Sequence, residues 1–449
     1  MKNLMLLFVA ALSFVISPYV AFANTPISIP YEKYVLPSNG LEIILSEDHS
    51  LPIVAVNVWY HAGPINEPPS RTGFAHLFEH LMFQGSKHVG DDMHFKLLEA
   101  SGASLINGTT DYDRTNYFET VPSNQLEMVL WLESDRMGFL RDTLTQEKLD
   151  NQREVVMNER RQSVDNVPYG PSNEKLIQAL FPPEHPYYGN VIGSMEHLTA
   201  ATLDDVRTFY DAYYAPSNAT LVVAGDFDVK KTKTWIDTYF ATLSKRDKPA
   251  VPQVTTPNIS AEKRVSVPEA VSAAQVNISW LTPAAYQTGD ADCDILAMIL
   301  GIGKSSRLYK NLVYTKELAQ QVSVHQESLA LRSTFTITAT ARPGVSAEKL
   351  ERAIEAELVL LQKNPPTALE ITRARNMLLT TMLESLENIG GFGGKADMLN
   401  RYNQYVGNPG YLNDDLARYQ KVTQETLKQT AQTYLRKDAR VVVTTVPQS

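Results

Sequence analysis

The sequence predicts an α+β protein of two domains built on the same plan. The chain has 449 residues, more than one hydrophobic core usually holds. Each half mixes hairpin-like strands with helical runs, which favours α+β domains over a strictly alternating parallel sheet. Each half also ends on a helix, a short loop and a strand, at 203–214 and 219–225 in the first half and at 424–434 and 439–446 in the second. These matching ends indicate a duplication.

The first 23 residues read as a signal peptide. Met1-Lys2 is a short positive start, residues 4–16 are almost wholly apolar, and Ala21-Phe22-Ala23 has the small-x-small pattern of a cleavage site. A membrane anchor is the alternative, but the apolar run is short for a bilayer span and is interrupted by Ser17-Pro18. We expect cleavage after about Ala23 and an exported protein without a membrane span, periplasmic if the source is a Gram-negative bacterium.

The mature chain divides at a linker. Residues 244–257 carry three prolines, several charges and no periodicity, which is typical of a connecting segment. The expected units are therefore an N-terminal domain at 24–243 and a C-terminal domain at 258–449.

Composition excludes some classes of function. The formal net charge is -9 and no basic stripe is visible, which argues against a nucleic-acid partner. Cys293 is the only cysteine, so no intramolecular disulfide can form, and we expect it to be a small buried hydrophobe.

The individual elements follow from apolar periodicity and from Gly and Pro punctuation. In the first half we expect strands within 34–46 and at 53–61, helices at 72–84, 91–100, 125–137 and 145–162, and strands at 103–106 and 115–120 around a polar turn at 108–114. In the second half we expect a strand at 275–280 and a helix at 290–300.

The pentapeptide His76-Leu77-Phe78-Glu79-His80 carries the strongest functional signal. Residues three and four apart share one face of a helix, so the two imidazoles can meet at one Zn²⁺ ion. H-x-x-E-H is the inverted form of a zinc-peptidase signature, in which the glutamate accepts a proton from the activated water. The pattern predicts one zinc ion per chain, with Glu79 as the catalytic base.

A catalytic zinc normally has three protein ligands, so one more is required. The predicted helix at 145–162 offers Glu147, Glu154 and Glu159, and spacing alone does not choose among them.

The pentapeptide and the later segment Gln152-Arg153-Glu154-Val155-Val156-Met157-Asn158-Glu159-Arg160 together resemble the pitrilysin/insulinase family of zinc peptidases. The resemblance is closest to the short-subunit branch that includes mitochondrial processing peptidase, and it covers essentially the whole mature chain. Family-like segments also occur at 71–75, 215–218 and 224–226. The resemblance implies two homologous domains, each a mostly antiparallel sheet packed with helices, that face each other around a chamber.

The resemblance also implies roles for particular residues. It makes Glu159 the third zinc ligand, with Glu154 as the alternative. The family often has a supporting acid seven residues before the ligand, where this chain has Gln152, so that role falls to the amide or to Glu154. The segment Asn107-Gly108-Thr109-Thr110 matches the edge strand with which the family pairs an extended substrate.

The second half lacks a zinc motif, as the second domain of the family does. Its segment 301–308 matches a family loop rich in glycine and serine, after which active members carry an Arg and a Tyr that assist the substrate carbonyl. Those positions are Val313 and Gln320 here, and neither side chain supplies a guanidinium or a phenol. We therefore expect a paralogous, zinc-less subunit to supply the Arg and the Tyr.

Alternatives stay open at this level. The chain could work alone or as a homodimer, it could be a non-catalytic binding or assembly subunit of the same fold, or it could hydrolyse a non-peptide bond. One further segment, residues 390–394 (Gly-Gly-Phe-Gly-Gly), is interpreted as a flexible hinge between long helices rather than a ligand loop.

Overall fold

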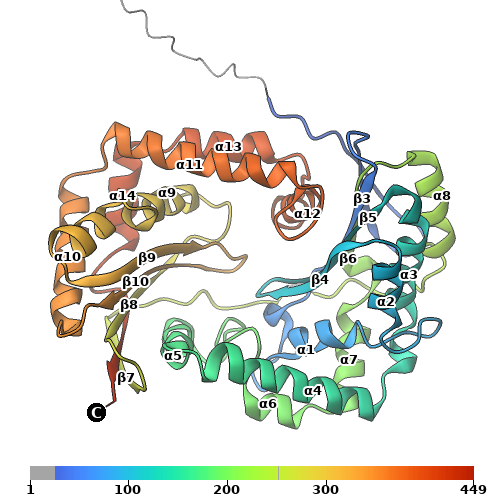
Figure 1. The fold of residues 1–449 in the computed structure, drawn as a ribbon, viewed down its shortest axis with the longest axis horizontal. Helices are drawn as coiled ribbons and strands as arrows, with labels where there is room; N and C mark the ends of the chain where they lie inside the picture. The colour runs from blue at the N-terminus through green and yellow to red at the C-terminus, as the bar shows by residue number, and fades with distance from the viewer. Residues whose placement is uncertain (1–25, 251, 449) are drawn as a thin grey trace, which may run out of the picture.

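The computed structural model describes residues 26–250 and 252–448 and contains two β-sheets, one in each half of the chain (Figure 1). The predicted signal peptide lies outside the described residues. The expected α+β architecture of two domains is confirmed. Within the described residues, no helix is both long enough and apolar enough to cross a membrane.

The N-terminal sheet has six strands in the order β1-β2-β6-β3-β5-β4. Their bounds are β1 Glu32–Val35, β2 Glu42–Glu47, β3 Ile53–Tyr60, β4 Ser104–Asp111, β5 Arg114–Pro122 and β6 Ala219–Gly225. Only β2 and β6 are parallel, and β4 is an edge strand.

The C-terminal sheet has five strands in the order β7-β11-β8-β10-β9. Their bounds are β7 Lys263–Glu269, β8 Gln275–Thr282, β9 Ala319–Glu327, β10 Ser333–Ala341 and β11 Val441–Pro447. Here β7 and β11 are the parallel pair.

The two sheets share one topology. The order β2-β6-β3-β5-β4 corresponds strand by strand to β7-β11-β8-β10-β9, with one parallel pair followed by three antiparallel pairs in each. The duplication inferred from the matching chain ends is therefore visible in the strand order.

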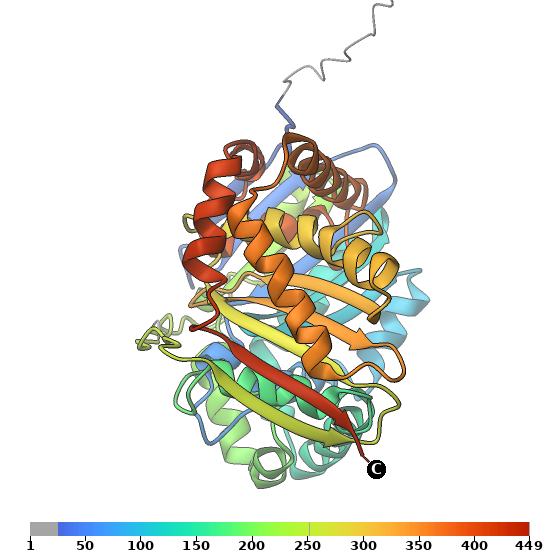
Figure 2. The same cartoon turned by 90° about the vertical axis from the view of Figure 1, so that its left-hand side faces the viewer.

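Helices cover both sheets. In the first half they are α1 Phe74–Leu81, α2 Met93–Ala100, α3 Leu126–Phe139, α4 Gln146–Arg160, α5 Gly170–Leu180, α6 Met195–Ala200, α7 Leu203–Tyr213 and α8 Val229–Tyr239. In the second half they are α9 Asp290–Gly301, α10 Ala347–Lys363, α11 Ala368–Glu387, α12 Lys395–Val406, α13 Leu412–Gln420 and α14 Gln424–Tyr434. Figure 2 shows α10 lying across the outer face of the C-terminal sheet.

Both faces of the N-terminal sheet are buried. Successive side chains of a strand point to opposite faces. Val54, Val56 and Val58 of β3 therefore join the core formed with α1, α3 and α7, while Ala55 joins a smaller cluster on the other face. That smaller cluster is completed by Ala396 and Leu399 of α12 and by Ile389 just before it, all from the second half of the chain.

Each half packs one helix against the sheet of the other half. While α12 packs on β3 and β6, α5 of the first half packs on β7, β8 and β11 of the C-terminal sheet. The Glu269 carboxylate, at the end of β7, accepts hydrogen bonds from the Tyr169 and Ser172 backbone N–H groups at the start of α5. A carboxylate at a helix N-terminus satisfies otherwise unpaired donors, so this contact fixes α5 against the second sheet.

One local prediction is wrong. The polar stretch 108–114 was expected to be a turn, but β4 continues to Asp111 and β5 begins at Arg114. Edge strands tolerate polar residues on the side that lacks a partner, so polarity alone did not identify the turn. Cys293 is fully buried in α9, as expected.

Candidate metal and peptidase site

The start of α1 is held by a buried carboxylate. Gly73 has φ 87°, and a Cβ there would lie 2.5 Å from the Ile192 carbonyl oxygen. Glu67 accepts hydrogen bonds from the backbone N–H groups of Gly73 (2.9 Å) and Ala75 (2.7 Å), and burial raises its pKa to about 7. Glu67 was not identified from the sequence, where its only signal is an acid just before Pro68-Pro69.

Packing then sets the orientation of α1. Phe74, Leu77, Phe78 and Leu81 enter the N-terminal core. His76 and His80 lie toward α4, which contacts α1 directly. The side chains of His76 and His80 are 12% and 22% exposed, so the two rings are reachable from solvent.

Three of the predicted ligands meet between α1 and α4. His76 Nε2 lies 3.7 Å from Glu159 Oε1, and His80 Nε2 lies 3.3 Å from Glu159 Oε2. One possible ligand atom from each of the three residues lies within 4.8 Å of the corresponding atoms of the other two. Two ligands on a tetrahedral zinc, with bonds of about 2.0–2.2 Å, are separated by about 3.4 Å. The donor set and its spacing therefore fit a zinc ion.

The protonation of these groups also suits a metal. Burial, and then the nearby His80, lowers the pKa of His76 to about 4, so His76 is neutral at physiological pH. A hydrogen bond from His80 is the main cause that lowers the pKa of Glu159. Neutral imidazoles and an ionised carboxylate are the forms that bind Zn²⁺.

Among the acids of α4, only Glu159 joins the two histidines. Glu147 and Glu154 are exposed to solvent. Gln152 is 7% exposed and lies two turns before Glu159 on the same face of the helix.

Glu79 lies beside the cluster and against β4. Glu79 is 9% exposed, and burial raises the pKa of its carboxyl group. Thr110 Oγ donates a hydrogen bond of 2.6 Å to Glu79 Oε2. A Cβ on Gly108 would lie 2.9 Å from Glu79 Cγ, so glycine allows β4 to approach this side chain. The segment Asn107–Thr110 thus borders the cluster at a sheet edge that has no neighbouring strand within the described residues.

The two second-half positions offer no catalytic chemistry. Val313 is 8% exposed and belongs to the C-terminal core. The Gln320 amide donates a hydrogen bond to the Ala341 carbonyl oxygen. Val313 is thus buried in the core, while Gln320 is exposed but carries an amide rather than a guanidinium or a phenol.

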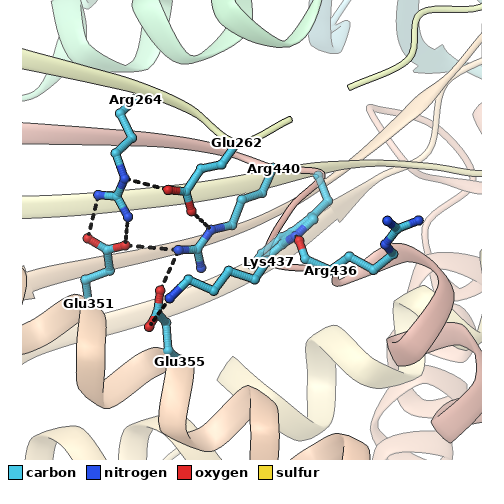
Figure 3. A network of polar contacts seen from close by, with 8 residues as sticks. Glu262, Arg264, Glu351, Glu355, Arg436, Lys437 and Arg440 are labelled. Atoms are coloured by element: carbon cyan, nitrogen blue, oxygen red, sulfur yellow. Dashed lines mark hydrogen bonds and ion pairs between the residues drawn. The ribbon is translucent and has the colours of Figure 1, made fainter. Parts of the chain in front are cut away.

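Two other groups of three possible ligands are occupied by arginines. In the first, His94, Glu119 and Glu133 are buried together, and Arg136 is paired with Glu133. In the second, Glu262, Glu351 and Glu355 bind Arg264 and Arg440 (Figure 3). In each group an arginine already pairs with at least one carboxylate, so these groups are poor sites for a cation.

An inverted zinc-binding motif on the first of two similar α+β domains defines a class of metallopeptidase. Residues 42–181 match the family model described as Insulinase (Peptidase family M16), and residues 200–378 match that described as Peptidase M16 inactive domain. The chain therefore belongs to peptidase family M16, and the resemblance to pitrilysin and insulinase is confirmed.

Several relatives span most of the chain. The zinc protease PqqE of Helicobacter pylori is 30% identical over 373 residues, covering 82% of each protein. The uncharacterized zinc protease YmxG of Bacillus subtilis is 23% identical over 356 residues, covering 78% of this chain and 83% of that one.

Solved structures agree in fold. A protease from Helicobacter pylori superposes with a TM-score of 0.85 at 27% identity, covering 93% of this chain and 99% of that one. The periplasmic protease PqqL of Escherichia coli superposes with a TM-score of 0.76 at 18% identity, covering 94% of this chain and 48% of that one.

Proposed function

We propose that this chain is an exported zinc metalloendopeptidase that cleaves extended or unfolded peptides. His76, His80 and Glu159 would hold one zinc ion, and Glu79 would be the general base. The observation that carries the proposal is the approach of both histidine Nε2 atoms to Glu159, at 3.7 and 3.3 Å, beside the buried Glu79. Export rests on the signal-like segment at 1–23.

Bound zinc would act as a Lewis acid toward the substrate carbonyl and the attacking water. Glu79 would accept the proton of that water and donate it to the leaving amine. The hydrogen bond from Thr110 keeps the Glu79 carboxylate in one orientation. The burial that raises the pKa of Glu79 makes it a stronger base than an exposed glutamate.

The edge strand supports an extended substrate. Asn107, Gly108, Thr109 and Thr110 belong to β4, which can pair through its main chain with a peptide in β conformation. Main-chain pairing tolerates many side chains, which suits a peptidase that acts on unfolded segments.

The Glu79→Gln variant tests the proposal. Its hydrolysis of an unstructured reporter peptide should fall about 10²–10⁴-fold because proton transfer is lost, while zinc content stays near that of the unmodified protein. Glu99→Gln, an exposed residue of α2, is the matched control and should keep its activity. Full activity of zinc-loaded Glu79→Gln would refute the assignment.

A partner subunit completes the proposal. Val313 and Gln320 leave this chain without the Arg and Tyr expected in the second domain, so a zinc-less paralogue would supply them. The native protein should co-purify with a related chain, and activity should rise when that chain is added. Equal activity with and without it would favour a chain that works alone or as a homodimer.

A non-catalytic subunit is the second candidate. The match of residues 200–378 to a model described as an inactive domain favours it. A zinc-loaded preparation that cleaves no peptide, either alone or with its paralogue, would support this alternative.

A further inference from the structure

The glycine-rich loop 390–394 is packed against the N-terminal sheet. It connects α11 to α12, and a Cβ on Gly390 would lie 2.8 Å from the Ala55 Cβ of β3 and would collide with the Thr120 hydroxyl of β5. The expected flexible hinge is thus a loop held close to the sheet of the other half. Its glycines permit this close approach.

One buried carboxylate anchors the loop. Asp397, which is 6% exposed, accepts a hydrogen bond from the Gly393 backbone N–H at 2.9 Å. Its other oxygen accepts hydrogen bonds from Trp59 Nε1 at 3.0 Å and from Asn116 Nδ2 at 3.2 Å. The loop is therefore hydrogen-bonded through Asp397 to β3 and to β5, and β5 is the strand that pairs with β4.

Phe392, in the middle of this loop, points an apolar ring at solvent. It is 69% exposed, although the loop around it is anchored. The Arg114 guanidinium lies 5.7 Å from the centre of the Phe392 ring and donates a 2.8 Å hydrogen bond to the Thr109 carbonyl oxygen of β4. The ring is thereby positioned next to the proposed substrate strand.

Leu105 of β4 is exposed and strained at the same place. It is 58% exposed and has φ 54°, a left-handed conformation that costs about 1 kcal/mol for a residue with a Cβ. A Cβ on Gly391 would lie 3.2 Å from Leu105 Cδ1, so the leucine lies against the loop. Residues with a strained backbone cluster at active sites and ligand clamps.

We propose that Leu105 and Phe392 form a subsite for an apolar side chain of a substrate bound along β4. Gly108 lies against Glu79, and Leu105 precedes it by three residues, across an irregularity in the pairing of β4 with β5 between Ser104 and Asn107. The subsite would therefore bind a side chain about three residues from the cleaved bond. Main-chain pairing by itself does not select a sequence, so the subsite would add a preference for an apolar side chain. This inference rests on the proposed peptidase function.

The test uses unstructured peptides of Ser, Ala and Gly in which a single Phe is moved along the chain. Binding to zinc-loaded Glu79→Gln protein is measured by fluorescence anisotropy, and cleavage by the active full-length protein with its paralogue is mapped by mass spectrometry. Phe at one position, about three residues from the cut, should improve binding roughly tenfold over Ser.

Two variants should remove that preference. Phe392→Ser and Leu105→Ser should each reduce the Phe-over-Ser ratio severalfold, and Phe392→Tyr should retain it. Leu369→Ser is the matched control, because Leu369 is a 79% exposed leucine on α11 outside this subsite.

The outcomes separate the two proposals. If cleavage persists but the ratio is unchanged in both serine variants, the subsite is refuted and the peptidase function stands. If binding depends on Phe392 but no peptide is cleaved with or without the paralogue, the subsite stands and the peptidase function fails.

Discussion

The two halves of this protein place different chemistry on the same scaffold. In the N-terminal half, α1 follows β3 and contacts α4, and this helix pair carries His76, His80 and Glu159. In the C-terminal half, α9 follows the equivalent strand β8 and contacts α11. There the contact is apolar, with Leu296 of α9 and Ile371 of α11 in one core cluster.

The comparison separates what maintains the fold from what confers function. Five strands have the same order in both sheets although, of the two equivalent helix pairs, α1 and α4 bring three possible metal ligands together and α9 and α11 do not. Burial of apolar area stabilises both domains, and His76, His80 and Glu159 are partly exposed, so they replace little of that area. A handful of side chains is therefore sufficient to give one of two similar domains a possible metal site.

The halves also differ in how they neutralise a buried arginine. Arg136, in the N-terminal core, is paired with Glu133 beside Glu119, and all three are about 1% exposed. Arg440, in the C-terminal half, is also 1% exposed but reaches Glu262, Glu351 and Glu355 near the surface (Figure 3).

The largest expected effect is on metal binding in the N-terminal half. Glu159→Gln should weaken zinc binding by roughly a hundredfold or more, because a neutral amide replaces an anionic ligand. Zinc content after dialysis against a weak chelator measures this loss.

Two variants on the same helix serve as comparisons. Glu147→Gln, at an exposed position, should retain one zinc per chain. Loss of zinc in Glu154→Gln rather than in Glu159→Gln would make Glu154 the ligand.

The next effect is on stability of the C-terminal half. Arg440→Met should lower the free energy of unfolding by about 3 kcal/mol, because three carboxylates lose a shared buried partner. Urea denaturation followed by circular dichroism measures the change. Arg436→Met is the control, since its side chain is 52% exposed and such surface pairs contribute about 0.5 kcal/mol. Equal losses in the two variants would contradict the role of the network.

The last expected effect is a pH dependence from the N-terminal core. Burial, and then the charge of Glu133, raises the pKa of Glu119 well above its usual range. The folded protein then holds a proton that the unfolded chain releases above about pH 4.3, so Glu119 makes the unfolding free energy fall as pH rises.

Glu119→Gln removes that contribution. Its stability relative to the unmodified protein should therefore increase from about pH 5 to about pH 8, as measured by urea denaturation across that range. Glu99→Gln is the exposed control. Parallel pH profiles for Glu119→Gln and the unmodified protein would contradict a shifted Glu119.

Sequence patterns predicted much of the fold because many elements carry local signals. The strand at 219–225 and the helix at 424–434 were predicted with their observed bounds, because alternation and capping residues mark them clearly. The turn at 108–114 was misplaced because an edge strand and a polar loop have similar composition. The packed loop 390–394 was also unpredictable, since a glycine cluster does not reveal which distant surface it contacts.

The resemblance to the family implied that positions 313 and 320 lack an Arg and a Tyr. The residues by themselves determined the inverted motif and the matching helix, loop and strand at the end of each half. These are local features, readable from residue types and spacing. The spacing of the acids left Glu147, Glu154 and Glu159 open, the resemblance favoured Glu159, and the tertiary structure brings Glu159 to the histidines. Only the tertiary structure decided that α12 packs on the N-terminal sheet, that α5 packs on the C-terminal sheet, and that Phe392 lies beside β4. Such contacts join residues far apart in the chain, and they depend on how whole helices and sheets pack to bury apolar surface.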